Sequence, residues 1–244
     1  MRQPWRPPHV ARRAVVPVAA MRFTKLTAST AVLAACAHAP DHHAGHGHHG
    51  GAHAMPHRFD DAARWAQEFE SPERDAWQRP DLVVSALSLP RDARVADLGA
   101  GTGYFAVRLA RAVPEGRVWG VDIEPAMVRW MLDRARRENL PNLTATLAAP
   151  DDALLPEPVD LVLVVDTYHH IDARTAYFTA LRRSLRPGGR VVIVDFTLES
   201  PVGPPAAMRL APAVVRQEFA AAGYAFERSV EGLTRQYMLV FRAP

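Results

Sequence analysis

The stretch VADLGAGTGYF, residues 95–105, joins a short apolar run to a glycine-rich turn. Its glycines, Gly99, Gly101 and Gly103, let the backbone turn sharply and approach a ligand closely, and a helix is expected directly after them. The next apolar run ends at Asp122, 19 residues after Gly103, where a carboxylate can accept both hydroxyl groups of a ribose. The stretch therefore predicts a strand, a turn and a helix that bind a nucleoside-containing ligand.

Glycine-rich turns followed by an acid also occur in nicotinamide dehydrogenases, so this pattern alone leaves two classes of cofactor open. Three features argue against a dinucleotide. Asp97 stands two residues before Gly99, and Tyr104 occupies the place where a dinucleotide fingerprint has its third glycine. In addition, the run LRPGGRVVIVDF (185–196) precedes a chain end that has the pattern of a β-hairpin.

Apolar runs of strand length alternate with helix-like segments along the sequence. The runs cover residues 93–98, 116–123, 143–148, 159–166 and 190–196. The helix-like segments cover residues 103–112, 125–138 and 173–186. Such alternation is typical of right-handed βαβ units and of a parallel sheet with helices on both faces.

The end of the chain has a different pattern. A helix after Pro212 is followed by two strand-like runs, 224–230 and 235–243, and the short turn between them requires an antiparallel hairpin. The predicted fold class is therefore α/β and Rossmann-like: a seven-stranded, mostly parallel sheet with a C-terminal antiparallel hairpin and helices on both faces.

The segment before the first strand, residues 58–90, has the pattern of two short helices. Trp65 and Phe69 recur at helical spacing, and Ser71 followed by Pro72 matches an N-cap with proline in the first turn. Aromatic side chains at this spacing are typical of core packing. Helices in this place can also form a lid over a site.

Five segments together resemble the class I S-adenosylmethionine-dependent methyltransferases, within their broad small-molecule group. They are, in chain order, DLGAGTGYF, GVDIEPAM, DDALLP, VDLVLVVDTYHHI and LRPGGRVVIVDF. The resemblance covers residues 58–244 and implies S-adenosylmethionine as the cofactor. It does not specify a substrate, so the expected methyl acceptor is an unidentified small molecule.

The resemblance also implies cofactor contacts by matching position. Asp97, with the three glycines, would form the pocket for the methionine part and bind its amino group. Asp122 would hold the ribose, and Ile123 would pack on the adenine. Asp166, at the end of the fourth strand, would border the sulfonium and the substrate.

A further acid of the family receives the adenine amino group. It lies five residues before the proline of DDALLP, which selects Asp151 and leaves Asp152 as the near competitor.

Methyl transfer is an in-line displacement, so alignment and exclusion of water can supply much of the catalysis. A base is needed only where the nucleophile carries a proton. Tyr168, His169 and His170 follow the fourth strand, where family members often place residues that face the substrate. We expect the base to be His169 or His170, and we expect Asp195 to be structural. No metal-ligand spacing occurs within residues 58–244.

The basic charge of the chain is concentrated at its N-terminus. Six of the 29 Lys and Arg residues and one of the 26 Asp and Glu residues lie in residues 1–57, so residues 58–244 carry a net charge of −2. This nearly neutral balance lacks the excess of basic residues that is typical of nucleic-acid-binding domains. Nucleic acid is therefore not an expected partner. The single cysteine excludes an internal disulfide and a four-cysteine zinc site.

Residues 1–36 have the order of a secretory signal: positive charges at Arg22 and Lys25, a mildly apolar stretch, then small residues before Cys36. The tetrad LAAC (33–36) resembles a bacterial lipobox, in which the cysteine carries lipid. Met21 is an alternative start of the chain. This interpretation predicts a lipid-anchored protein of the cell envelope that faces the periplasm. The alternatives are a free cysteine in a disordered tail and a cytoplasmic protein with a non-functional leader.

Residues 37–57 form a histidine-rich linker with Gly and Ala between the histidines. Imidazoles at variable spacing can bind Zn, Cu or Ni, and a solvated tether is the alternative role. The candidate metal ligands are His42, His43, His46, His48 and His49.

Two other functions stay open at this stage. One is a non-catalytic envelope protein that keeps the fold as a binding module while its histidine tract binds metal. The other is a dinucleotide-dependent oxidoreductase.

Overall fold

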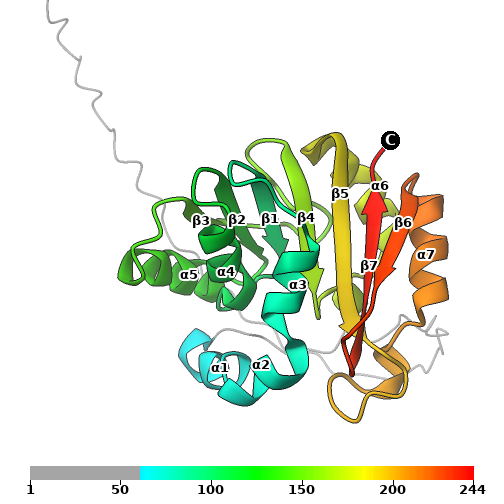
Figure 1. Ribbon diagram of the computed structural model, residues 1–244, viewed down its shortest axis with the longest axis horizontal. Coiled ribbons are helices and arrows are strands. Elements are labelled where there is room, and N and C mark those ends of the chain that lie inside the picture. The colour runs from blue at the N-terminus through cyan, green and yellow to red at the C-terminus, as the bar shows by residue number, and fades with distance from the viewer. Residues whose placement is uncertain (1–60) are drawn as a thin grey trace, which may run out of the picture. The chain divides into compact units, whose positions relative to one another are not determined.

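The computed structural model describes residues 61–244; Cys36 and the histidine tract lie outside the described residues. One seven-stranded sheet has the order β3-β2-β1-β4-β5-β7-β6 (Figure 1). The strands are β1 Arg94–Leu98, β2 Arg117–Asp122, β3 Leu143–Leu147, β4 Val159–Val165, β5 Leu185–Phe196, β6 Ala225–Val230 and β7 Gln236–Arg242. Strands β3, β2, β1, β4 and β5 pair in parallel, and β7 pairs antiparallel with both β5 and β6. The predicted fold class is confirmed, with its C-terminal hairpin.

Seven α-helices surround this sheet in the described part of the chain. They are α1 Ala62–Phe69, α2 Pro72–Gln78, α3 Pro80–Ala86, α4 Tyr104–Ala112, α5 Pro125–Arg137, α6 Arg174–Leu181 and α7 Pro212–Ala221. Helices α3, α4 and α5 cover one face of the sheet, and α6 and α7 cover the other (Figure 1). Short 3-10 helices follow β4 and α6, and a third lies between β5 and α7.

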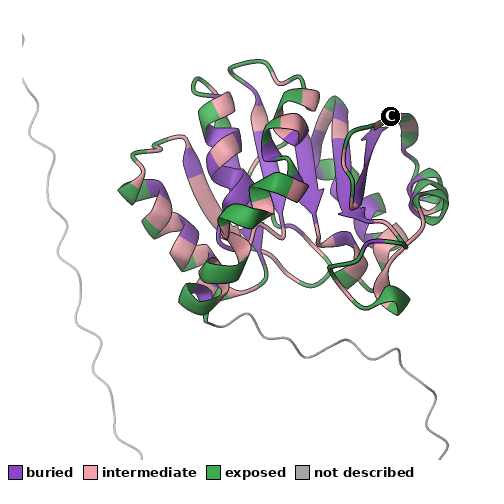
Figure 2. Ribbon diagram, turned by 60° about the horizontal axis from the view of Figure 1, so that its bottom comes forward, coloured by how far each residue is buried: buried purple, intermediate pink, exposed green. Residues whose placement is uncertain are grey.

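Each face of the sheet has its own apolar core. On one face Val95 and Val192 pack with Leu109 of α4, and on the other Ile193 packs with Phe219 of α7. The strands are therefore buried on both faces, as the purple ribbons in Figure 2 show. Burial of each such side chain stabilises the fold by about 1.5–3 kcal/mol. Because both faces are buried, the strands are rich in valine and do not alternate strictly between apolar and polar residues.

Two local predictions were wrong. Three helices, not two, precede the sheet, because Arg79 adopts the left-handed conformation with φ of 47° and separates α2 from a new helix that begins at Pro80. The helix expected over 173–186 ends at Leu181, and β5 begins at Leu185, which pairs with Val159 of β4. Pairing with the neighbouring strand therefore begins β5 five residues before the apolar run 190–196 that the sequence indicated.

The parallel strands end at one edge of the sheet, and α1 and α2 lie at that edge (Figure 1). Between β1 and β4 the strand order reverses direction, because β2 and β3 lie on one side and β5 on the other. In open α/β sheets this switch point is where ligands bind. Asp97 of β1 and Asp166, directly after β4, flank it.

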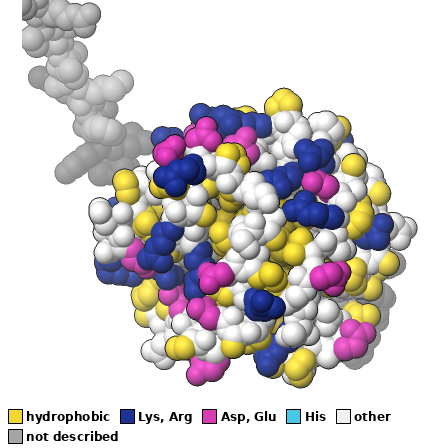
Figure 3. Space-filling model, in the orientation of Figure 1, with side chains coloured by type: hydrophobic (Ala, Val, Ile, Leu, Met, Phe, Trp, Pro, Cys, Tyr) yellow, Lys and Arg dark blue, Asp and Glu magenta, His cyan; other side chains and the backbone are white. Residues whose placement is uncertain are grey.

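Basic and acidic side chains are interspersed on the face of the molecule that Figure 3 shows. None of the helices in residues 61–244 has the length and apolar character needed to cross a bilayer.

Candidate active site

The glycine turn after β1 has a conformation that only glycine adopts easily. Gly99, Gly101 and Gly103 have φ of +73°, +55° and +88°. A Cβ at Gly99 would lie 2.2 Å from Oγ1 of Thr167, whereas a Cβ at Gly101 would meet nothing closer than the Phe69 ring at 3.5 Å. The turn therefore packs tightly against the end of β4 at Gly99 and lies beneath α1 at Gly101.

Asp97 is a buried carboxylate that lacks a full set of partners. The residue is 2% exposed, and its Oδ2 has no hydrogen-bond partner in the described structure. Burial raises the pKa of Asp97 to about 7, although the backbone N–H of Ala106 and the charge of Arg74 lower it. A buried carboxylate oxygen without a partner is costly. It is a site that an ammonium group of a ligand would satisfy.

Asp122 at the end of β2 is held by backbone donors. Its Oδ2 accepts a hydrogen bond from the Gly101 N–H at 2.7 Å, and its Oδ1 accepts one from the Glu124 N–H at 2.9 Å. Burial raises the pKa of this carboxyl. Ile123, the next residue, is 52% exposed. A fixed carboxylate beside an exposed apolar side chain fits a ribose and the flat ring attached to it.

The two acids after β3 have different surroundings. The carboxylate of Asp152 forms an ion pair with Arg183 and accepts a hydrogen bond from the Leu154 N–H at 3.0 Å. Asp151 is exposed, and no hydrogen bond or ion pair to its carboxylate is found among the described residues. The carboxylate of Asp152 is thus engaged within this loop, whereas the carboxylate of Asp151 is open to a ligand.

Asp166 is the centre of a polar network. The residue has a left-handed φ of 54° directly after β4. Its Oδ2 lies 3.4 Å from Nη2 of Arg74, and its Oδ1 accepts a hydrogen bond from Nε2 of Gln236. Gln236 in turn accepts a hydrogen bond from Nε2 of Gln78 at 2.5 Å. Burial raises the pKa of Asp166, and the charge of Arg74 opposes this rise.

His169 forms a buried pair with Asp195. Its Nδ1 lies 2.9 Å and 3.0 Å from the two carboxylate oxygens, and the side chains are 3% and 4% exposed. The Phe196 N–H also donates to Oδ1 of Asp195 at 2.8 Å. His170 is exposed, and its ring centroid lies 4.2 Å from that of His169. An aspartate that receives Nδ1–H fixes the histidine tautomer and leaves Nε2 as the basic atom.

Tyr168 contacts neither Asp166 nor the His169–Asp195 pair. It is 1% exposed, its ring packs against Phe178 and Phe219, and its hydroxyl donates to Oε2 of Glu218 at 2.5 Å. Burial, together with Glu218, raises the pKa of this tyrosine. Tyr168 belongs to the core under α6 and α7, because side chains at successive positions of the turn point to different sides.

Several residues of the site could not be predicted from the sequence, because no motif contains them. Arg74, Gln78, Gln236 and Tyr237 come from segments that the sequence marked only as helix or strand, and the buried hydroxyl of Tyr237 has no hydrogen-bond partner in the described structure. Asp195 did have a signal, since it is a single acid within the apolar run RVVIVDF. A lone buried acid in a strand requires a partner.

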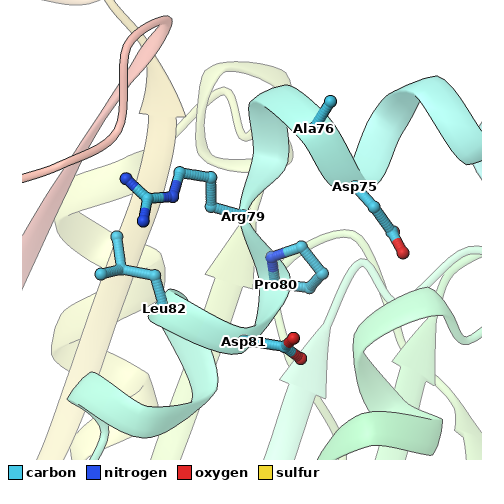
Figure 4. A pocket seen from close by; sticks show the side chains of 6 residues that line it. All are labelled: Asp75, Ala76, Arg79, Pro80, Asp81 and Leu82. Carbon is cyan, nitrogen blue, oxygen red and sulfur yellow. The ribbon is translucent and has the colours of Figure 1, made fainter.

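Two negative observations limit the site. Residues 61–244 contain no cluster of three or more histidine, cysteine, aspartate or glutamate side chains arranged to hold a metal ion. A hollow of about 280 Å³ at the junction of α2 and α3 is lined by Asp75, Ala76, Arg79, Pro80, Asp81 and Leu82 (Figure 4). None of the predicted cofactor contacts lines this hollow.

Part of the chain is similar in sequence to known methyltransferases. Residues 95–189 match the family model described as a methyltransferase domain. The 27-O-demethylrifamycin SV methyltransferase of Amycolatopsis mediterranei is 32% identical over 143 residues, which cover 57% of this chain and 52% of that protein. The chain spans about half the length of the curated relatives it matches.

Solved structures share the fold at low identity. A SAM-dependent methyltransferase from Aquifex aeolicus superimposes with a TM-score of 0.70 and 22% identity, covering 75% of this chain and 99% of that one. The [4+2]-cyclase SpnF superimposes with a TM-score of 0.58 and 18% identity, covering 69% and 81%. This fold is therefore found in a protein named for another reaction as well as in methyltransferases.

Residues 95–189 are thus similar to a methyltransferase domain, and the chain has the fold of solved S-adenosylmethionine-dependent methyltransferases. The residues present fit that cofactor. Asp97 offers an unpartnered buried oxygen to an ammonium group, Asp122 and Ile123 suit an adenosine, and the three glycines let the backbone approach it.

Proposed function

We propose that the protein transfers the methyl group of S-adenosylmethionine to a small-molecule acceptor. The observation that carries this proposal is the buried Oδ2 of Asp97, which has no partner in the described structure and adjoins three glycines with positive φ. A protein that used the fold only as a scaffold would gain stability by replacing this aspartate. Asp97, Asp122 and Asp151 hold the cofactor in this proposal.

The catalytic contribution of the chain is alignment and proton removal. When bound, S-adenosylmethionine supplies a methyl carbon activated by positively charged sulfur. Asp166 stabilises this positive charge from the end of β4, and α1 and α2 exclude water from the edge of the sheet.

His169 is the proposed base, with Asp195 as the residue that positions it. Nδ1 is held by Asp195, so Nε2 takes the proton of the nucleophile as the new bond to carbon forms. The carbon–sulfur bond breaks at the same step, and S-adenosylhomocysteine is the second product. His170 is not assigned this role, because it is exposed and its tilted ring lies against that of His169, with the centroids 4.2 Å apart.

The names of the relatives support an acceptor that loses a proton. They include O-methyltransferases and C-methyltransferases. A neutral hydroxyl or an acidic carbon gains a methyl group with loss of a proton, which is the step that a histidine base assists. We therefore propose an acceptor of this chemical class.

Calorimetry on the full chain tests the proposed function. Titration with S-adenosylhomocysteine is expected to give a dissociation constant in the micromolar range, and NAD is expected not to bind. Binding of NAD alone would support an oxidoreductase, and binding of neither would support a non-catalytic module. A binding-competent protein that transfers no labelled methyl group to any small molecule of a cell extract would contradict the proposed catalysis.

We also propose that the chain is anchored to the cell envelope through lipid on Cys36, with residues 37–57 as a tether. The support is the sequence LAAC after a charged and apolar segment. Cells that express the wild type or Cys36→Ser are labelled with a palmitate analogue. Labelling of the wild type alone is expected, and equal labelling of both proteins would contradict the anchor.

A further inference from the structure

Tyr237 is a buried tyrosine of β7 that the proposed mechanism does not use. The residue is 8% exposed, and its hydroxyl has no hydrogen-bond partner among the described residues. A buried hydroxyl without a partner costs free energy, and a phenylalanine in the same place would avoid that cost. The hydroxyl of Tyr237 is therefore a hydrogen-bond donor that is available to a ligand.

Tyr237 stands at the carboxyl edge of the sheet, next to the proposed base. It is the second residue of β7 and lies directly opposite Asp195, the second-last residue of β5. Side chains directly opposite each other in an antiparallel pair lie on the same face of the sheet. Asp195 in turn contacts Nδ1 of His169, which follows β4. The three side chains thus come from the ends of β4, β5 and β7, which are neighbours in the sheet.

The surroundings of Tyr237 keep its hydroxyl protonated. Burial raises the pKa of this tyrosine, and so do the carboxylates of Asp195, Glu218 and Asp166. The charge of Arg174 acts in the opposite direction. The side chain therefore stays neutral at physiological pH and donates its hydrogen.

Asp195 is the carboxylate of this group that has no arginine partner in the described part of the chain. The two other carboxylates are neutralised: Asp166 pairs with Arg74, and Glu218 pairs with Arg174. Asp195 pairs instead with His169, which is neutral before it accepts a proton. The region around Tyr237 thus has an excess of negative charge, which disfavours a carboxylate or a phosphate beside the hydroxyl.

We propose that the hydroxyl of Tyr237 donates a hydrogen bond to a second, uncharged oxygen of the acceptor, next to the hydroxyl that loses its proton to His169. This inference rests on the proposed function and names its substrate class: a phenol or enol with a neighbouring hydroxyl or carbonyl group. A histidine removes a proton most effectively from a group of similar pKa, and phenols and enols come closer to this condition than aliphatic alcohols. Tyr237 is then a specificity residue, which orients the acceptor and takes no part in the proton transfer.

Methyl transfer to three probes tests this inference on the full chain. Phenol, catechol and salicylate share a phenolic hydroxyl and carry a hydrogen, a hydroxyl and a carboxylate beside it. With labelled S-adenosylmethionine, kcat/KM of the wild type is expected to be at least fivefold higher for catechol than for phenol, and lowest for salicylate. Equal values for catechol and phenol, a preference for salicylate or no transfer to catechol would each overturn the inference.

Tyr237→Phe removes the hydroxyl and keeps the ring. It is expected to lower kcat/KM for catechol about fivefold, mainly through KM, and to change the value for phenol less than twofold. Its melting temperature and its affinity for S-adenosylhomocysteine should not fall. The matched control is Tyr224→Phe, because the hydroxyl of Tyr224 has a protein partner, the backbone oxygen of Phe178 at 2.9 Å. This control is expected to lower the melting temperature by about 2–4 °C and to leave the kinetics unchanged.

Two results with Tyr237→Phe would contradict the assigned role. Equal losses of kcat for catechol and phenol, with a shifted pH profile, would mean that Tyr237 acts through the His169–Asp195 pair. A lower melting temperature with unchanged kinetics would mean that the hydroxyl has a structural partner, such as a buried water molecule.

Calorimetry with S-adenosylhomocysteine separates this inference from the proposed function. Failure of the wild type to bind this ligand contradicts both. A wild type that binds it and methylates a compound of a cell extract, but not catechol, contradicts the substrate class alone and leaves the proposed function intact.

Discussion

The two halves of the site are built in different ways. In the half formed by β1 and β2, the carboxylate of Asp122 accepts hydrogen bonds from the backbone N–H groups of Gly101 and Glu124. Gly101 belongs to the glycine turn after β1, and Glu124 is the second residue after β2. In the half formed by β4, β5 and β7, Asp166 contacts Gln236, 70 residues away, and Arg74, 92 residues away. The first half depends on the conformation of the main chain, and the second depends on side chains that only folding brings together.

The two halves of the site are therefore sensitive to different kinds of substitution. A backbone site fails when a glycine is replaced, because the new Cβ disturbs the conformation. A side-chain network fails when one partner is removed, because the others remain buried without it. Substitutions in the two halves should therefore have different signatures in stability, cofactor affinity and pH dependence.

The largest effect is expected from Gly99→Ala in the first half. A Cβ at this position would lie 2.2 Å from Thr167 at the end of β4, and φ of +73° adds strain. We expect the free energy of unfolding to fall by about 3 kcal/mol or more. The matched change Gly101→Ala adds a Cβ 3.5 Å from Phe69 and should cost about 1–2 kcal/mol. Urea denaturation measures both, and equal losses would contradict the tight packing at Gly99.

Asp97→Asn should lower the affinity for the cofactor without lowering the stability of the fold. The variant is expected to bind S-adenosylhomocysteine about 100-fold more weakly, because the ammonium group loses its buried charged partner. Since the pKa of Asp97 is raised to about 7, wild-type affinity should rise about tenfold between pH 6 and pH 8 as the carboxyl ionises. Calorimetry across this range should give a steeper pH dependence for the wild type than for Asp97→Asn.

The same carboxyl has the opposite effect on the ligand-free protein. Its pKa is higher in the folded than in the unfolded chain, so the folded state binds more protons between about pH 4 and about pH 7, and stability falls as the pH rises through this window. Above about pH 7, Asp97→Asn should therefore be more stable than the wild type by about 2–4 kcal/mol. Lower stability of the variant at pH 8 would show that the carboxylate is well satisfied.

A smaller pair of effects distinguishes the two acids after β3. Asp151→Ala should weaken S-adenosylhomocysteine about tenfold without a change in stability, because its exposed carboxylate serves only the ligand. Asp152→Ala should lower the free energy of unfolding by about 1 kcal/mol and leave the affinity unchanged, because it removes the contacts with Arg183 and Leu154. The reverse assignment of the two outcomes would make Asp152 the adenine ligand.

The smallest effect is expected at Tyr168. Tyr168→Phe removes the hydrogen bond to Glu218 and retains the ring in its apolar core, so the loss of stability should be about 1 kcal/mol. Cofactor affinity should not change. A tenfold loss of affinity for S-adenosylhomocysteine would return Tyr168 to the site, in contrast to its position in the structure.

Much of the fold could be predicted because its signals are local. The alternation of apolar runs with helix-like segments predicted the parallel sheet, and the short connection after residue 230 predicted the hairpin. The errors arose where tertiary contacts decided. Pairing of Leu185 with Val159 began β5 earlier than its composition indicated, and the left-handed residue Arg79 divided a segment that composition left continuous.

The β1–β2 half of the site could be predicted without a structure, because glycines and a strand-end acid at fixed spacing indicate both the turn and its ligand class. The other half depends on the tertiary arrangement. It paired His169 with Asp195, placed Tyr168 in the opposite core and brought Arg74, Gln78 and Gln236 to Asp166. The physical reason is that a backbone motif carries its geometry in neighbouring residues, whereas the partners of a buried side chain depend on which distant segments the sheet places beside it.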